Sequence, residues 1–275
     1  MTHWDITGPQ TLDLGNLDDH DDAGPVRVLH LRVVAGDVSV TATDGPARLE
    51  VHRLTGEPLR VELADGVLTV AYQDLSWGGI LGWLAKGRQR REVSLALAVP
   101  PACEVHLGTV SADAVVSGVT EPTTVRTVSG EITLDSLGGG ICARTVSGNV
   151  ESLSLAGDLT FETVSGDLTV GSGSCSRLSA TTVSGDVMAS VDVRTGGRVD
   201  VKTVSGRVVL RLPAGPTGAE VGVESVSGRL TSTITGVSTT TAPGRRRLRG
   251  SFGDGTGELR VKTVSGDVDL LAAPS

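Results

Sequence analysis

A tetrapeptide that recurs along the chain constrains the fold more than any other feature. Thr-Val-Ser-Gly begins at Thr127, Thr145, Thr163, Thr182, Thr203 and Thr263, and variants begin at Thr109 (TVSA) and Ser225 (SVSG). Successive starts lie 18, 18, 18, 19, 21 and 22 residues apart, and the last gap is 38 residues. Repeats of this length form structures in which each copy packs against its neighbours. The last gap is twice 19, which predicts one degenerate repeat between Ser225 and Thr263.

Each repeat has the pattern of two short strands. Residues 131–134 and 167–170 alternate after the glycine, and residues 140–145 and 157–163 alternate before the next TVSG. Alternation with period two indicates strands with one buried face. Eighteen residues cannot bury such a face alone, but stacked copies can. We therefore predict an all-β, single-chain β-solenoid of about 18–22-residue TVSG repeats, stacked about 4.7–4.9 Å apart.

Every position of the motif has a structural explanation. A β-branched threonine suits a strand, a serine hydroxyl can bond local backbone at the turn, and glycine supplies unusual dihedral angles at a corner. The motif is therefore predicted to be structural and not catalytic.

Residues 1–108 are also β-like but less regular, with candidate strands at 26–34, 38–43, 48–54, 67–72 and 92–99. Residues 33–38 (VVAGDV) resemble a worn copy of TVSGDV and lie 76 residues, four times 19, before Thr109. We predict irregular N-terminal coils and a cap over 1–108. They would continue into the regular repeats of 109–275 as one domain.

Composition narrows the function classes. A net charge of −8 disfavours general nucleic-acid binding. With 2% aromatics the core must be aliphatic, and the three cysteines form neither a disulfide framework nor a zinc motif. The first residues resemble no signal peptide, and no apolar run is long enough to cross a bilayer. We expect a soluble, cytoplasmic protein.

No catalytic motif is visible, and neither a cofactor, a metal nor a small-molecule substrate is expected. One repeated position, after the motif glycine, is often acidic. Stacked carboxylates there could chelate a cation or act on a polysaccharide as an acid–base pair, or they could be solvated turn residues. The residues at this position are Glu131, Asn149, Asp167, Asp186, Arg207, Arg229 and Asp267.

Two segments are candidate contact surfaces. The first combines an apolar helical face with a basic cluster, which suits an anionic membrane but also a plug for the solenoid end. The second is an arginine-rich segment bounded by Pro243 and glycines, which indicates a protruding loop. The candidate residues are Trp77, Ile80, Leu81, Trp83, Leu84, Lys86, Arg88, Arg90 and Arg91 in the first, and Arg245, Arg246, Arg247 and Arg249 in the second.

The serial TVSGD[VL] repeats, with VPP at 99–101 leading into TVSA at 109, resemble the bacterial "putative adhesin" family, a domain of unknown function with β-strand repeats. The resemblance covers residues 26–271. It implies a β-solenoid without established catalytic residues, and the family's name implies surface binding.

These observations together predict a non-enzymatic β-solenoid scaffold or binding module, adhesin-like and peripheral to the inner membrane face. Its partner would be a protein, a lipid or a glycan, with an anionic membrane surface as one candidate. The alternative is a carbohydrate-active β-helix enzyme that uses the stacked acidic ladder.

Overall fold

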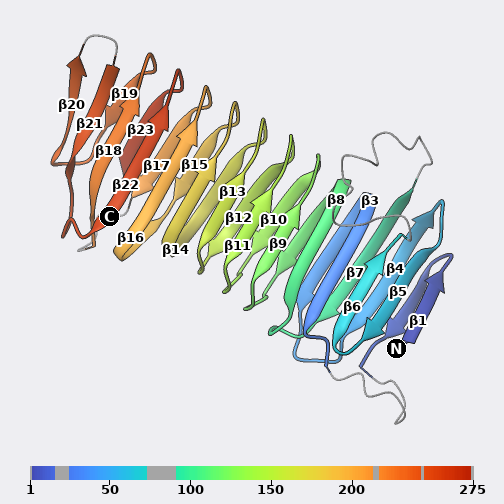
Figure 1. Cartoon of the computed structure of the whole chain (residues 1–275). Helices are drawn as coiled ribbons and strands as arrows, with labels where there is room; N and C mark the ends of the chain where they lie inside the picture. Colours follow the sequence, from blue (N-terminus) through green and yellow to red (C-terminus); the bar gives the residue numbers. More distant parts are fainter. Residues whose placement is uncertain (1, 16–24, 73–90, 213–216, 243–244, 274–275) are drawn as a thin grey trace. The chain divides into compact units, whose positions relative to one another are not determined.

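The computed structural model describes residues 2–15, 25–72, 91–212, 217–242 and 245–273 (Figure 1). All regular secondary structure in these ranges is β-strand, so the all-β prediction is confirmed. Contacts divide the chain into two compact units, Met1–Gly139 and Gly140–Ser275.

Unit 1 combines a parallel stack with antiparallel strands. Two long strands, β3 (Val28–Ala42) and β8 (Glu104–Ser117), pair in parallel over nearly their whole length. Beyond β8, β9 and β10 continue the parallel pairing, while on the other side β4, β5, β1 and β2 pair antiparallel. The other strands are β1 (Thr2–Ile6), β2 (Gln10–Asp13), β4 (Arg48–Thr55), β5 (Leu59–Ala64), β6 (Val67–Ala71), β7 (Glu92–Val99), β9 (Thr123–Arg126) and β10 (Glu131–Asp135).

The worn repeat at 33–38 is in register with the repeat at Thr109, but it lies directly beside that repeat and not four coils away from it. Val33 is the direct partner of Thr109, and Asp37 is the partner of Asp113. The 76 residues between these copies therefore do not form four intervening coils, and the two copies are immediate neighbours. Residues 48–64 form antiparallel strands instead, which corrects the expectation of degenerate early coils.

Unit 2 consists of two sheets joined at the TVSG corners, and its strands are parallel except for β20 and β21. We call sheet A the sheet formed by the strands that precede each TVSG motif, and sheet B the sheet formed by the strands that follow each motif. Strand β14 is long enough to belong to both sheets. The strands are β11 (Ile141–Arg144), β12 (Asn149–Leu155), β13 (Leu159–Glu162), β14 (Leu168–Thr181), β15 (Val187–Ser190), β16 (Asp192–Thr203), β17 (Val208–Leu212), β18 (Ala219–Ser225), β19 (Leu230–Ser232), β20 (Val237–Ala242), β21 (Arg245–Ser251), β22 (Gly257–Thr263) and β23 (Val268–Ala272).

Consecutive repeats stack in register as far as the Thr203 repeat. Ile141 pairs with Leu159, and Val187 pairs with Val208. The inward positions hold Val, Leu, Ile and Ala, with Phe161 as a fully buried aromatic. This agrees with the predicted aliphatic core.

The Thr263 repeat is inserted between the Thr203 and Ser225 repeats. Strand β22 pairs in parallel with β16 on one side and with β18 on the other, and β23 lies between β17 and β19 in the same way (Figure 1). Strands β20 and β21 pair antiparallel with each other, and β21 also pairs antiparallel with β18. The predicted degenerate coil between Ser225 and Thr263 is therefore wrong, because the chain passes the end of the stack and returns into it.

The buried threonine of each TVSG motif in unit 2 closes the corner. Its Oγ1 accepts a hydrogen bond from the N–H of the glycine three residues later, at 2.9 Å in the case of Thr182 and Gly185. The serine hydroxyl instead donates to the valine carbonyl of the neighbouring repeat, as Ser184 does to Val164 at 3.4 Å. The predicted local hydrogen bond of the serine is therefore wrong. The threonine makes it, because its side chain points inward at the corner.

The motif glycine is required by close packing. A Cβ added to Gly185 would lie 1.8 Å from the carbonyl oxygen of Gly166 in the preceding repeat. Gly185 does not have a positive φ, whereas Gly130 has one of 112°. The predicted unusual dihedral angles are therefore wrong for Gly185. Glycine is needed there because no side chain fits between two stacked corners.

Candidate functional site

The acidic ladder is engaged in backbone hydrogen bonds between repeats. Asp167 Oδ1 accepts from the N–H of Asp186 at 2.8 Å, and Asp186 Oδ1 accepts from the N–H of Arg207 at 2.7 Å. Asn149 does the same for Asp167 at 3.0 Å with an amide oxygen. In unit 1, Asp113 accepts from Glu131 at 2.7 Å. The position therefore favours short side chains with an acceptor oxygen, whether or not they carry charge.

A ridge of exposed valines runs along the corners of unit 2. The second residue of each motif is between 43% and 51% exposed, which is unusual for a valine in so regular a fold. Serine N–H groups that bond the valine carbonyls of neighbouring repeats establish their order in the stack. We call these residues the valine ridge; in stack order they are Val146, Val164, Val183, Val204, Val264 and Val226.

Beside the ridge, the outer surface of sheet A is basic. Lys202 and Lys262 are direct partners on β16 and β22, and each lies two residues before a ridge valine, so both project from the same face as the ridge. Arg198 and Arg260 lie on the same strands, and Arg177 is the partner of Arg198 on β14. The cationic side chains of this basic face are Arg177, Arg198, Lys202, Arg245, Arg247, Arg249, Arg260 and Lys262; the acidic ones among them are Asp200, Glu220, Glu224 and Glu258.

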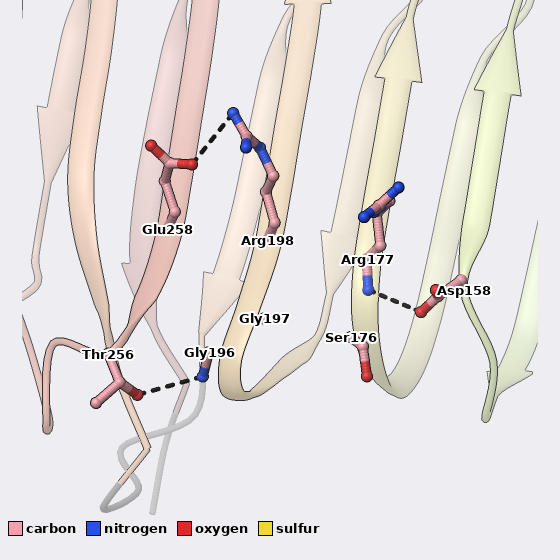
Figure 2. A pocket seen from close by; sticks show the side chains of 8 residues that line it. All are labelled: Asp158, Ser176, Arg177, Gly196, Gly197, Arg198, Thr256 and Glu258. Carbon is pink, nitrogen blue, oxygen red and sulfur yellow. Dashed lines mark hydrogen bonds and ion pairs between the residues drawn. The ribbon is translucent and has the colours of Figure 1, made fainter.

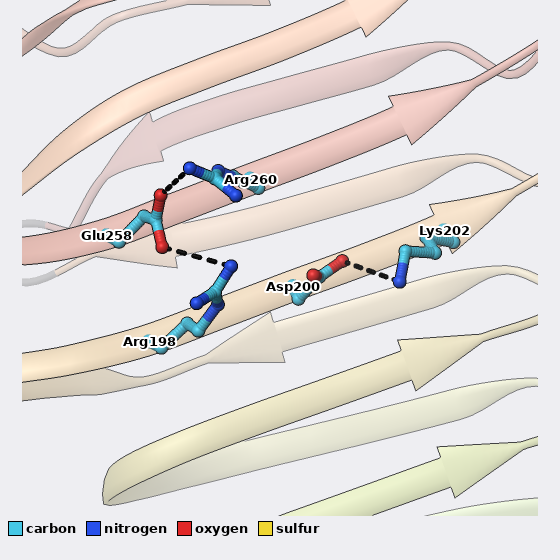
Figure 3. A network of polar contacts seen from close by, with 5 residues as sticks. All are labelled: Arg198, Asp200, Lys202, Glu258 and Arg260. Atoms are coloured by element: carbon cyan, nitrogen blue, oxygen red, sulfur yellow. Dashed lines mark ion pairs between the residues drawn. The ribbon is translucent and has the colours of Figure 1, made fainter.

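Ion pairs engage three of the four carboxylates of the basic face, Asp200, Glu224 and Glu258. Glu258 bridges Arg198, at 3.1 Å, and Arg260, and Asp200 lies 3.6 Å from Lys202 (Figure 3). All the cations except Arg247 are exposed, whereas of the four acids only Glu220 is. The outermost charges on this face are therefore positive, although the chain as a whole carries −8.

A polar groove lies at the end of the basic face away from the ridge (Figure 2). Its volume is about 490 Å³, and its residues are Asp158, Ser176, Arg177, Gly196, Gly197, Arg198, Thr256 and Glu258. Its two carboxylates are already engaged: Asp158 Oδ1 accepts the N–H of Arg177 at 2.8 Å, and Glu258 binds Arg198. The exposed guanidinium of Arg177 can therefore meet an anionic group from outside.

The predicted arginine loop at 245–249 is a strand. In β21, Leu248 is fully buried, and Arg247 and Arg249 alternate with it on the outer face. Arg247 Nε pairs with Glu224 at 3.1 Å, and Arg246 reaches back to the carbonyl of Gly228 at 3.0 Å. The strand forms because β18 and β20 supply hydrogen-bonding partners on both sides.

The other predicted surface lies largely outside the described residues, since Trp77, Ile80, Leu81, Trp83, Leu84, Lys86, Arg88 and Arg90 all fall in 73–90. Arg91 is described. It pairs with Glu57 at 2.8 Å and lies over the ring of buried Tyr72, 5.4 Å from its centroid. Arg91 thus has protein partners in unit 1.

Within the described ranges no cluster of three or more His, Cys, Asp or Glu side chains could hold a metal ion. The same residues contain no helix long and apolar enough to cross a membrane. All three cysteines are free thiols, and Cys103 and Cys175 are buried.

The sequence predicts that the repeats stack, but the exposure of the motif valines was not predicted. Most of the basic face was not predicted either. Lys202 and Arg260 are far apart in the chain and meet only because β22 is inserted beside β16. A signal was present in the printed sequence: the hexapeptide VKTVSG occurs at 201–206 and again at 261–266, and these two copies are neighbours.

Comparison with known proteins gives one family match. Residues 149–271 match the family described as Toastrack DUF4097. No curated protein matches the chain. Two similar solved structures are a putative adhesin from Bacteroides fragilis NCTC 9343 (10% identity, 95% of each chain, TM-score 0.48) and a putative lipid binding protein from Parabacteroides distasonis ATCC 8503 (12% identity, 97% of each chain, TM-score 0.41). The family match confirms the expected resemblance to a domain-of-unknown-function family.

Proposed function

We propose, starting from the match of residues 149–271 to the family described as Toastrack DUF4097, that the chain is a non-enzymatic β-solenoid binding module that docks on an anionic lipid surface. The docking surface is the basic face of unit 2 together with the valine ridge. The proposal keeps the expected location at the inner membrane face, where anionic lipids attract basic protein surfaces.

The observation that carries the proposal is that exposed cations and exposed apolar side chains are continuous on one face. Lys202 and Lys262 each stand two residues from a half-exposed ridge valine, Val204 and Val264. Each cation near an anionic membrane contributes about 1 kcal/mol. Completing the burial of a half-exposed valine adds roughly another 1 kcal/mol. Several such residues together suffice for reversible peripheral binding.

The acidic ladder supports a binding module over the carbohydrate-active alternative. A glycosidase needs a pair of carboxyl groups that are free to exchange protons on either side of a bond. Asp167 and Asp186 each accept a backbone N–H from the next repeat, and they lie at a regular surface position. That geometry is typical of a structural hydrogen bond.

Co-sedimentation with vesicles tests the proposal. We expect the purified protein to bind vesicles that contain phosphatidylserine, to bind pure phosphatidylcholine vesicles much less, and to be released by salt. The variant Lys202→Glu with Lys262→Glu should lose most of this binding. Arg207→Glu with Arg211→Glu is the matched control, because it makes the same charge change at two exposed positions, one directly before β17 and one within β17 of sheet B.

A second pair of variants tests the apolar contribution. Val204→Ser with Val264→Ser should weaken vesicle binding and leave its salt dependence in place. Leu153→Ser with Met188→Ser removes two similarly exposed apolar side chains from sheet B and should bind as the unmodified protein does. Equal binding by the lysine variant and its control, or no binding to anionic vesicles at all, would refute the proposal.

A further inference from the structure

Sheet A of unit 2 ends in an unprotected edge strand. Strand β20 pairs antiparallel with β21 and with no other described strand (Figure 1). Its second edge therefore presents a row of backbone N–H and C=O groups. Ser238, Thr239 and Thr240 are all exposed, so side chains of the described residues do not cover the strand.

The other described strands that pair with a single neighbour carry features that discourage further pairing. Strand β19 has only three residues. Strand β1 contains His3 and Asp5, and β2 ends at Asp13, which is paired with Arg48 at 3.3 Å. Short length and charged side chains are the usual protection of an edge. Strand β20 has six residues, Val237–Ala242, with neither a charge nor a proline among them.

We propose that β20 pairs antiparallel with β20 of a second copy of this chain, which joins two sheets A into one continuous sheet. An antiparallel pair of identical strands is satisfied by a two-fold axis, so a single self-complementary edge is enough. Serine and threonine would face threonine and serine across the pair, and such cross-strand pairs are favourable.

Electrostatics permit this pairing. The nearest described cations, Arg245, Arg246, Arg247 and Arg249, all lie on β21, one strand in from the edge. Across the dimer their rows would be separated by three inter-strand spacings, roughly 14 Å. That distance exceeds the screening length of about 8 Å at physiological ionic strength, so the two arginine rows repel each other weakly.

The geometry of the pair has a consequence for docking. The two-fold axis of an antiparallel strand pair is perpendicular to the sheet, so the outer faces of both copies point in the same direction. The dimer would present two basic faces to one surface, which raises avidity without any new contact. The strand pairing itself does not depend on lipid binding, and each can fail without the other.

Sedimentation-velocity measurements over a range of protein concentrations test the pairing. The unmodified protein should show a reversible monomer–dimer equilibrium. Ser238→Glu with Thr240→Glu should weaken dimerisation at least tenfold, because four carboxylates would meet at the edge. The β20–β21 pair should remain folded, since positions 238 and 240 pair with Arg249 and Arg247 of β21. Ser179→Glu with Thr181→Glu, on interior strand β14, is the matched control and should dimerise normally.

Hydrogen exchange provides a readout that needs no variant. Amides of residues 237–242 in the unmodified protein should become better protected as protein concentration rises, while those of β18 should not change. A protein that stays monomeric throughout, a dimer that persists in the edge variant, or edge amides whose exchange is independent of concentration would each overturn the inference.

Discussion

Asp167 Oδ1 accepts a hydrogen bond from the backbone N–H of Asp186, 19 residues further along the chain, at a distance of 2.8 Å. The side chain of one repeat thus satisfies the backbone of the next, and the same contact recurs wherever the position holds Asp or Asn. Both Asp and Asn can occupy this position because each supplies the acceptor oxygen. The negative charge of Asp is not required for the hydrogen bond.

Substitution at this position should separate hydrogen bonding from charge. Asp167→Ala removes the acceptor and is expected to lower the free energy of unfolding by about 1 kcal/mol. Asp167→Asn keeps an acceptor oxygen, as Asn149 does naturally, and should cost much less. Urea denaturation measures both. Equal losses in the two variants would show that the charge, and not the hydrogen bond, stabilises the stack.

The corner glycines should be intolerant of any side chain. In Gly185→Ala the new Cβ would meet the carbonyl of Gly166 at 1.8 Å, so the repeats must separate locally, at a cost of about 1–3 kcal/mol or more. Gly222→Ala on β18 is the control, because the nearest atom to its Cβ would be 4.0 Å away. Thermal unfolding should show a marked loss of stability for the first variant and little change for the second.

The inserted repeat should hold the end of unit 2 together. A chain that stops after Gly255 lacks β22 and β23, and we expect β18 and β19 to lose their parallel partners while β11–β17 stay folded. Hydrogen exchange by residue would show fast exchange in 219–232. Unchanged protection of β18 in the truncated chain would contradict the inserted position of the Thr263 repeat.

Thiol reactivity should report which cysteines are in the core. Burial raises the pKa of Cys103 to about 12 and that of Cys175 to about 11, so neither forms appreciable thiolate near neutral pH. Cys142 lies partly exposed on the outer side of β11. A thiol reagent should modify Cys142 alone in the folded protein and all three cysteines in denaturant. Rapid labelling of Cys103 without denaturant would contradict its burial.

Tyr72 makes the stability of unit 1 sensitive to alkaline pH. Burial raises its pKa to about 12 from an ordinary value of 10.0, so the folded state favours the protonated phenol. Its contribution to stability is complete below pH 10 and is lost as pH rises through about 12. Tyr72 is the only tyrosine, so the ultraviolet absorbance of tyrosinate follows it alone. Ionisation of the folded protein near pH 10, as in denaturant, would disprove the burial of the hydroxyl.

Much of the local structure could be predicted from the residues in order. Period-two alternation around Ile132 and Leu168 indicated strands, and those positions are buried in β10 and β14. The repeat spacing predicted the parallel register of neighbouring copies, as in the pairing of Ile141 with Leu159. These properties follow from backbone geometry and side-chain alternation, which act over a few residues.

Local patterns along the chain are enough to predict the strands, the positions of the corners and the equivalence of the repeat copies. The order of the copies in the stack, and the face on which the charges gather, depend on how the whole chain folds. The VKTVSG copies at 201–206 and 261–266 are identical in sequence and present the same hydrogen-bonding edge. Local patterns therefore cannot predict which repeat lies beside which other repeat in the stack. The β20–β21 pair occupies the far side of β18, and β22 enters between β16 and β18. Lys202, Arg260 and Arg249 therefore share one face, because strand order is a property of the whole stack.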